Sequence, residues 1–182
     1  KSFRIVLIST FSALAIVLGY LLAYIPNIEL FTLTVFLAGF ILGKRDGMIM
    51  GFLSSFTFCF FNPLGASPLP LFAFQLTHYS ITGLVGGIIG NLFKKRKLFE
   101  FNDDLYKPSV MTLFGAIGAL ITSSFQFLSA LVEVLSYFGT LNEYVPYLMT
   151  GLIFTVVHII GNTLGFIFIL PGLIPLIKKM LY

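Results

Sequence analysis

Polar and ionisable side chains stand at intervals in a sequence that is otherwise strongly apolar, and they are the residues that could do chemistry. Gln75 precedes His78 and Tyr79 by three and four positions, so these side chains share one face of a helix. The other candidates, all hydrogen-bonding or acidic, are Asn62, Gln126, Glu133, His158 and Asn162. Inside a bilayer such groups are costly, and they are retained to hydrogen-bond neighbouring helices or to bind a polar ligand. Both interpretations apply to each residue singly, but their common bias toward one side favours a ligand site.

No signature of an enzyme accompanies these residues. The sequence lacks a nucleophile elbow, a zinc-protease helix, a histidine-carboxylate array and a phosphate-binding loop. The single cysteine, Cys59, stands among phenylalanines, as an inert apolar filler usually does. Two histidines without partner cysteines argue against a structural zinc site. We therefore expect no catalysis, no metal and no cofactor.

The composition indicates a membrane protein. Hydrophobic residues make up 58% of the 182 residues and charged residues only 10%, and the mean hydropathy is +1.01. A soluble domain normally has about 25% charged residues. The net charge of +4 comes from short basic clusters between apolar stretches, so it suits the anionic surface of a bilayer better than nucleic acid.

Charged or proline-rich turns divide the apolar sequence into six segments. They cover approximately residues 5–24, 28–43, 47–61, 71–93, 108–137 and 146–175. The second and third are short, but joining them would leave Lys44, Arg45 and Asp46 at bilayer depth. Glu29 is interpreted as a solvated acid at the start of the second segment. We predict one all-α membrane domain over residues 1–182, a bundle of six transmembrane helices.

The basic residues predict the orientation of this bundle. With six spans, all eleven of them fall on one side: Lys1, Arg4, Lys44, Arg45, Lys94, Lys95, Arg96, Lys97, Lys107, Lys178 and Lys179. Basic loops are retained in the cytoplasm, so both termini are predicted to be cytoplasmic. The opposite side has the loops around Pro26, Pro63 and Asn142, and the polar candidates lie nearer to it.

Small residues spaced four apart predict close helix contacts. In the first segment they are Ser9, Ala13, Ala15 and Gly19. These residues could pack within the bundle or dock a partner, and both interpretations stay open. Gly83, Gly86, Gly87 and Gly90 repeat the pattern in the fourth segment, where we expect internal packing.

The sequence resembles the S components of bacterial energy-coupling factor (ECF) vitamin transporters. The stretch from Arg4 to Ala13 is similar to the start of the first helix in that family, where an Ala-x-x-x-Ala pattern is typical and this chain has Ser9 and Ala13. Residues 36–43, the basic turn after them and residues 47–53 resemble the second and third helices.

The resemblance implies a non-enzymatic transport subunit in the bacterial cytoplasmic membrane. Its partners would be a transmembrane coupling subunit and two ATPases, with the small residues of the first helix facing the coupling subunit. It would capture a vitamin or related micronutrient at the outer face and deliver it by toppling. The polar candidates would form the substrate site, with the loop from Asn62 to Pro70 as its lid. Glu133 and the absence of outer basic residues favour a thiamine-like or cobalamin-like ligand.

A second hypothesis is a membrane scaffold of the rod-shape-determining type. Such a protein has a similar size and helix count but needs no polar pocket. An intramembrane enzyme is a third class, which the missing catalytic pairs disfavour.

Overall fold

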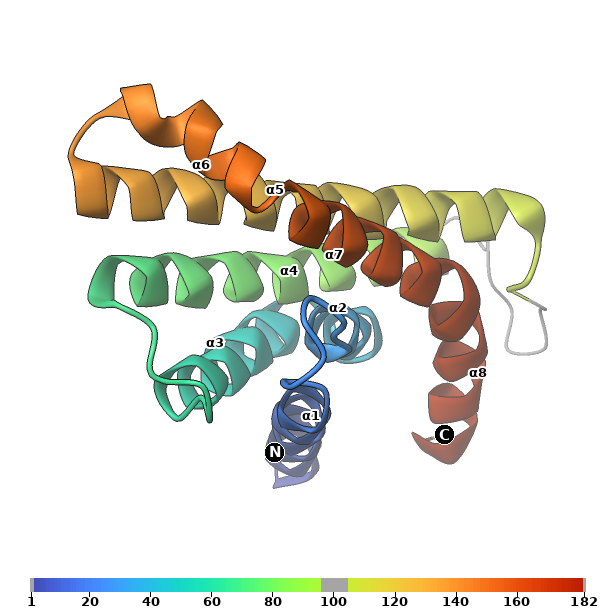
Figure 1. Cartoon of the computed structure of the whole chain (residues 1–182). Coiled ribbons are helices and arrows are strands. Elements are labelled where there is room, and N and C mark those ends of the chain that lie inside the picture. Colours follow the sequence, from blue (N-terminus) through green and yellow to red (C-terminus); the bar gives the residue numbers. More distant parts are fainter. Residues whose placement is uncertain (1, 96–104, 182) are drawn as a thin grey trace.

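A computed structural model describes residues 2–95 and 105–181, and it is all-helical (Figure 1). The helices are α1 (Ser2–Leu21), α2 (Phe31–Leu42), α3 (Lys44–Phe60), α4 (Leu69–Lys95), α5 (Pro108–Phe138), α6 (Tyr144–Thr150), α7 (Leu152–Leu164) and α8 (Leu170–Leu181). A 3-10 turn, Leu141–Glu143, precedes α6, and a π-helical turn, Gly165–Ile169, joins α7 to α8. Helix accounts for 86% of the structure, which confirms the all-α prediction. Three of the basic residues, Lys1, Arg96 and Lys97, lie outside the described residues.

Helix α2 is the centre of the bundle. Its residues from Phe31 to Ile41 are all buried, and it contacts α1, α3, α4 and α8. Figure 1 shows it surrounded by these neighbours. Twelve residues of helix extend only about 18 Å, less than the roughly 30 Å core of a bilayer. Because protein covers α2 on all sides, the bilayer does not determine its length.

Glycines on α4 let α2 and α3 approach its backbone. A β-carbon on Gly83 would overlap the carbonyl group of Gly47 in α3, and one on Gly86 would overlap the carbonyl of Phe36 in α2. Gly87 and Gly90 face the α2–α3 connection and Phe40 in the same way. The expected internal packing of this glycine stripe is confirmed, and it forms the closest helix contacts in the bundle.

Three stretches among the described residues are long and apolar enough to cross a membrane. They are Ser2–Leu21, Pro108–Phe138 and Leu152–Leu181, and Phe31–Leu42 is a shorter apolar helix. The chain is therefore a membrane protein with several apolar helices, and the count of six spans stays a prediction. The last predicted segment is divided, because α6 folds back over the end of α5 before α7 begins.

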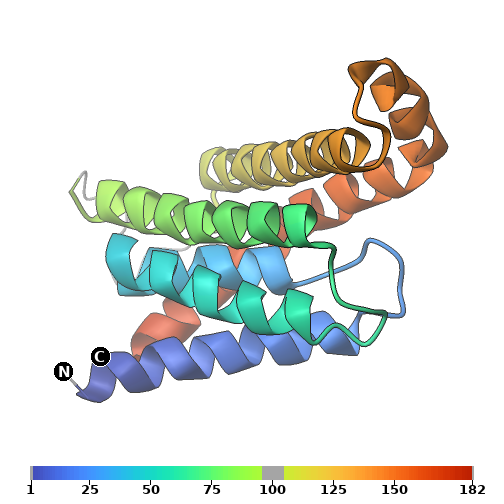
Figure 2. The same cartoon turned by 90° about the vertical axis from the view of Figure 1, so that its left-hand side faces the viewer.

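The two ends of the bundle differ in character (Figure 2). The start of α1, the α2–α3 turn, the end of α4 and the end of α8 lie toward the left of that view, and the described basic residues occur in these segments or in the nearby start of α5. We call this the basic end. The opposite end, the loop end, consists of residues 22–30, 61–68 and 139–143.

An ion pair joins two helices at the basic end. The guanidinium group of Arg4 donates from Nε and Nη2 to the carboxylate of Asp46, at 2.8 and 2.7 Å. Asp46 is buried in the first turn of α3, directly after Gly43, which turns the chain with a φ of +96°. The charges of the α2–α3 turn thus lie at the start of a helix, in agreement with the predicted division of this region into two segments.

Candidate functional site

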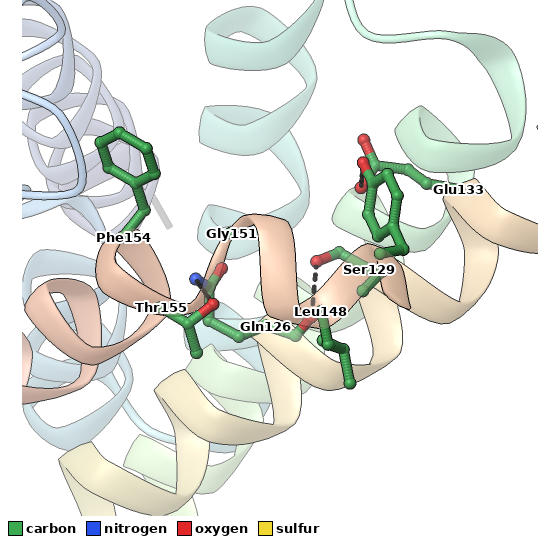
Figure 3. Close-up of a pocket in the computed structure, with 9 residues that line it drawn as sticks. Gln126, Ser129, Glu133, Leu148, Gly151, Phe154 and Thr155 are labelled. Carbon is green, nitrogen blue, oxygen red and sulfur yellow. Dashed lines mark hydrogen bonds between the residues drawn. The ribbon is translucent and has the colours of Figure 1, made fainter. Parts of the chain in front are cut away.

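A cavity of about 140 Å³ lies between α5, α6 and α7 near the loop end (Figure 3). Gln126 and Thr155 meet at one end of it, where Gln126 Nε2 donates to Thr155 Oγ1 at 3.2 Å. At the other end Glu133 Oε2 accepts a hydrogen bond of 3.2 Å from the hydroxyl of Tyr147. Gln126 and Glu133 line the same cavity because seven residues are about two turns of helix. The cavity therefore presents an amide, a hydroxyl and a carboxylate to a small molecule.

The sequence after α5 explains how α6 closes this cavity. Gly139 ends α5 in the left-handed region with a φ of +67°, and the hydroxyl of Thr140 accepts a hydrogen bond from the Asn142 amide to start the 3-10 turn. The chain then reverses direction, and the Tyr144 hydroxyl donates to the carbonyl of Phe127 at 3.0 Å. This reversal brings Tyr147 next to Glu133.

A second polar group lies deeper, around Glu29 from the α1–α2 loop. Oε1 of Glu29 accepts from Asn162 Nδ2 at 2.8 Å and lies 3.4 Å from His158 Nε2, while Oε2 accepts from the Thr32 amide at 2.8 Å. Asn162 also donates to Thr122 Oγ1 at 3.0 Å. Glu29 does start α2, as expected, but its side chain is only 17% exposed. The interpretation of Glu29 as a solvated acid is therefore wrong, because two α7 side chains hold it inside the bundle.

The third group lies where α4 meets α5. His78 Nε2 lies 3.1 Å from Ser124 Oγ, and the ring packs against Tyr79 and Phe125. Phe125 also contacts the ring of His158, so it separates this group from the Glu29 group. His78 Nδ1 and Gln75 Oε1 are buried and have no hydrogen-bond partner in the described part of the chain.

The structure thus distributes the predicted site residues over three groups instead of one pocket. Gln126 and Glu133 share the cavity, His158 and Asn162 hold Glu29, and His78 with Tyr79 borders Phe125. Asn62 lies apart, since its Oδ1 accepts from the Leu64 amide within its own loop at 2.9 Å.

The four small residues of α1 divide into two faces. Ser9 and Ala13 are exposed along the outside of the bundle, whereas Ala15 and Gly19 are buried against it. Gly19 lies against the rings of Phe31 and Phe58. Only Ser9 and Ala13 are exposed for contact with another protein in this arrangement.

Several contributors were not among the predicted residues. Tyr147 and Thr155 complete the cavity, Glu29 and Thr122 complete the buried group, and Ser124 pairs with His78. Glu29 had a detectable signal, because it is the one acid in the second apolar segment, 28–43. A tyrosine or threonine in an apolar helix carries no such signal, because either is common there for packing alone.

The buried environment of Glu29 leads to a pH-dependence that can be measured. Burial acts to raise the pKa of Glu29, but the hydrogen bond and charge of His158, with hydrogen bonds from Thr32 and Asn162, outweigh burial and leave the pKa lowered. A carboxyl with a lowered pKa stabilises the fold above its unfolded value of 4.5, and this stabilisation is lost as the pH falls through the folded value. Glu29→Gln should therefore lower the unfolding midpoint at pH 7, and the difference from wild type should shrink below about pH 4.5.

Thermal unfolding of both proteins in one detergent, between pH 3 and pH 8, measures this difference. Glu143→Gln is the matched control, because Glu143 is an exposed acid at the same end of the bundle. A constant difference between Glu29→Gln and wild type across this range would contradict the stabilising role of the carboxylate.

The chain matches a known protein family. The family described as "ECF transporter, substrate-specific component" matches residues 3–180, which is nearly the whole chain. No curated protein and no solved structure matches the chain.

Proposed function

Because the chain belongs to the substrate-specific components of ECF transporters, which are transport subunits and not enzymes, we propose that it captures a micronutrient at the outer face of the bacterial cytoplasmic membrane. In this proposal the loop end faces outward, the basic end faces the cytoplasm and the chain crosses the bilayer six times. The one-sided distribution of the basic residues supports this orientation.

We infer that the substrate binds at the cavity between α5, α6 and α7. The observation that carries this inference is the meeting of Gln126, Thr155, Tyr147 and Glu133 around one hollow in a helix bundle. Ligand sites combine a concave, mostly apolar surface with a few convergent polar groups. A volume of about 140 Å³ favours a small molecule or one part of it, and so favours a thiamine-like over a cobalamin-like substrate.

Delivery would require the separate subunits of the transporter. In this proposal Ser9 and Ala13 on α1 contact the transmembrane coupling subunit, and two ATPases supply the energy for toppling. The exposure of both small residues on one side of α1 supports this assignment.

Ligand-dependent stabilisation tests the proposed function. A panel of vitamins and their precursors should contain a compound that raises the thermal unfolding midpoint of the purified chain, since a ligand that binds only the folded state stabilises it. Gln126→Leu removes the hydrogen bond between Gln126 and Thr155. It should weaken binding of this compound about tenfold, which corresponds to a loss of roughly 1.4 kcal/mol of binding free energy. Isothermal titration of both proteins gives the ratio.

Thr77→Val is the control for a lost polar group, because Thr77 is exposed and bonds only within its own helix. It should bind the compound as wild type does. A chain that no vitamin or precursor stabilises would instead behave as the scaffold hypothesis requires, and mass spectrometry of the purified protein would then find no bound small molecule.

A further inference from the structure

Among the described residues, Glu133 differs from the other buried or half-buried acids in having no basic partner. Asp46 pairs with Arg4, and Glu29 lies beside His158. The hydroxyl of Tyr147 is the one hydrogen-bond donor to Glu133 among the described residues. The described lysines and arginines lie at the basic end, about the length of the bundle away. A carboxylate that is partly withdrawn from water without a cation is costly, so a positive charge from outside the chain would be stabilising there.

Glu133 also lines two separate hollows. On one side it borders the cavity with Gln126 and Thr155. On the other it borders a cavity of about 190 Å³ with Pro68, Leu71 and Tyr137, between the start of α4 and the end of α5. A molecule that enters by either route at the loop end meets this carboxylate.

A polar atom without a hydrogen-bond partner among the described residues lies further along the junction of α4 and α5. The hydroxyl of Ser124 lies 3.1 Å from His78 Nε2 and 2.8 Å from the carbonyl of Ile121. The other ring nitrogen, Nδ1, is buried without a partner in the described structure. His78 is only 8% exposed. It borders a largely apolar groove of about 370 Å³ that is also lined by Ser124, Val85 and Ile117.

Ser124, the partner of His78, and Glu133 lie on opposite faces of α5, because nine residues are about two and a half turns of helix. Ser124 precedes Glu133 by nine residues, which is about 13 Å of helix. The rings of Phe74, Tyr79 and Phe125 surround His78, and aromatic faces attract cations. Among the described residues, Glu133 lacks a basic partner and His78 Nδ1 lacks a hydrogen-bond partner. Gln75 can rotate its amide to offer either a donor or an acceptor.

We propose that the substrate of this chain is an organic cation with N–H donors, and that Glu133 selects for its positive charge. This inference rests on the proposed function and deepens it, because it gives the chemical class of the molecule that the site takes. A neutral or anionic molecule of the same size would leave the Glu133 carboxylate unpaired or repel it, and would therefore bind more weakly.

The experiment uses the full chain in detergent and three pools of small molecules. An ultrafiltrate of yeast extract is separated at pH 7 by cation and anion exchangers into cationic, anionic and neutral pools, each returned to the original volume. We expect the cationic pool alone to raise the unfolding midpoint of wild type, by about 5 °C. Mass spectrometry of protein washed after this treatment should find a retained cation.

Two substitutions test the role of Glu133. Glu133→Gln keeps the shape but removes the charge, and should require at least tenfold more of the cationic pool for half of the shift. Glu133→Asp keeps the charge and should retain most of the response. Glu143→Gln removes an exposed acid from the same end of the bundle and should respond as wild type does.

The outcomes distinguish the two proposals. Stabilisation of wild type by the neutral or anionic pool would overturn the assignment of an organic cation and leave the proposed function standing. An equal response of Glu133→Gln and wild type to the cationic pool would overturn the role of Glu133. If no pool stabilises wild type, the proposed function fails, and this inference fails with it. If Glu133→Gln does not fold, the pool that stabilises wild type and Glu133→Asp still decides whether the substrate is a cation.

Discussion

Replacement of Gly83 by alanine is expected to destabilise the packing of the bundle strongly. The added methyl group would overlap the backbone carbonyl of Gly47, and a backbone atom cannot move aside as the end of a side chain can. Helix α4 would have to separate from α3, and it would lose contact with α2 in the same movement. Overpacking of this kind costs about 3 kcal/mol, which for a chain of this size lowers the unfolding midpoint by about 10 °C. Thermal unfolding and size-exclusion profiles in detergent measure the loss.

Gly161→Ala supplies the matched control for this prediction. Gly161 lies within α7, and a β-carbon there would meet only the carbonyl of Asn27, at 4.0 Å. Alanine favours helix over glycine by up to about 1 kcal/mol, so this variant should unfold at the wild-type midpoint or slightly above it. Equal behaviour of Gly83→Ala and Gly161→Ala would contradict the close contact between α3 and α4.

Replacement of Ala13 by phenylalanine is expected to abolish uptake while leaving substrate binding intact. Ala13 is exposed on α1, which packs mainly against α2 and α3, whereas the cavity lies between α5, α6 and α7, so a larger side chain disturbs neither the core nor the cavity. Small residues permit helices to approach closely, and a phenyl ring at the proposed docking face would hold the coupling subunit away. Uptake by cells that express the whole transporter should fall at least tenfold. This corresponds to a loss of roughly 1.4 kcal/mol or more in the free energy of docking to the coupling subunit.

Leu14→Phe introduces the same ring about 100° further around α1, where the side chain is already large and exposed. This control should transport normally. Normal uptake by Ala13→Phe would contradict the docking role, and a loss of substrate binding by that variant would show that its effect arises inside the bundle.

The features predicted correctly from the sequence depend on local spacing. The glycines at positions 83, 86, 87 and 90 share one helix face whatever surrounds the helix, so their role in close packing followed from their intervals. The all-helical fold followed from long apolar stretches, since a bilayer accepts only structures that satisfy their own backbone hydrogen bonds.

The features that were missed depend on contacts between distant parts of the chain. The reversal at Gly139 separates α5 from α6, and it is this turn that brings Tyr147 to Glu133. Glu29 was interpreted as solvated because its neighbours in sequence form a loop, and its actual partner His158 is 129 residues away. Position within an apolar segment indicates how far a residue lies from the membrane surface, but it does not indicate which helix will cover that residue.

The hydrogen bonds of Glu29 also set an order for the synthesis and insertion of the chain. Its partners His158 and Asn162 follow it by 129 and 133 residues, so they are synthesised only after α1 to α5. Until α7 is made, burial of the Glu29 carboxylate in the bundle would leave its charge unpaired, which is costly. The α1–α2 loop therefore reaches its final position last although it is made early, and a nascent chain that stops before His158 would display this loop open.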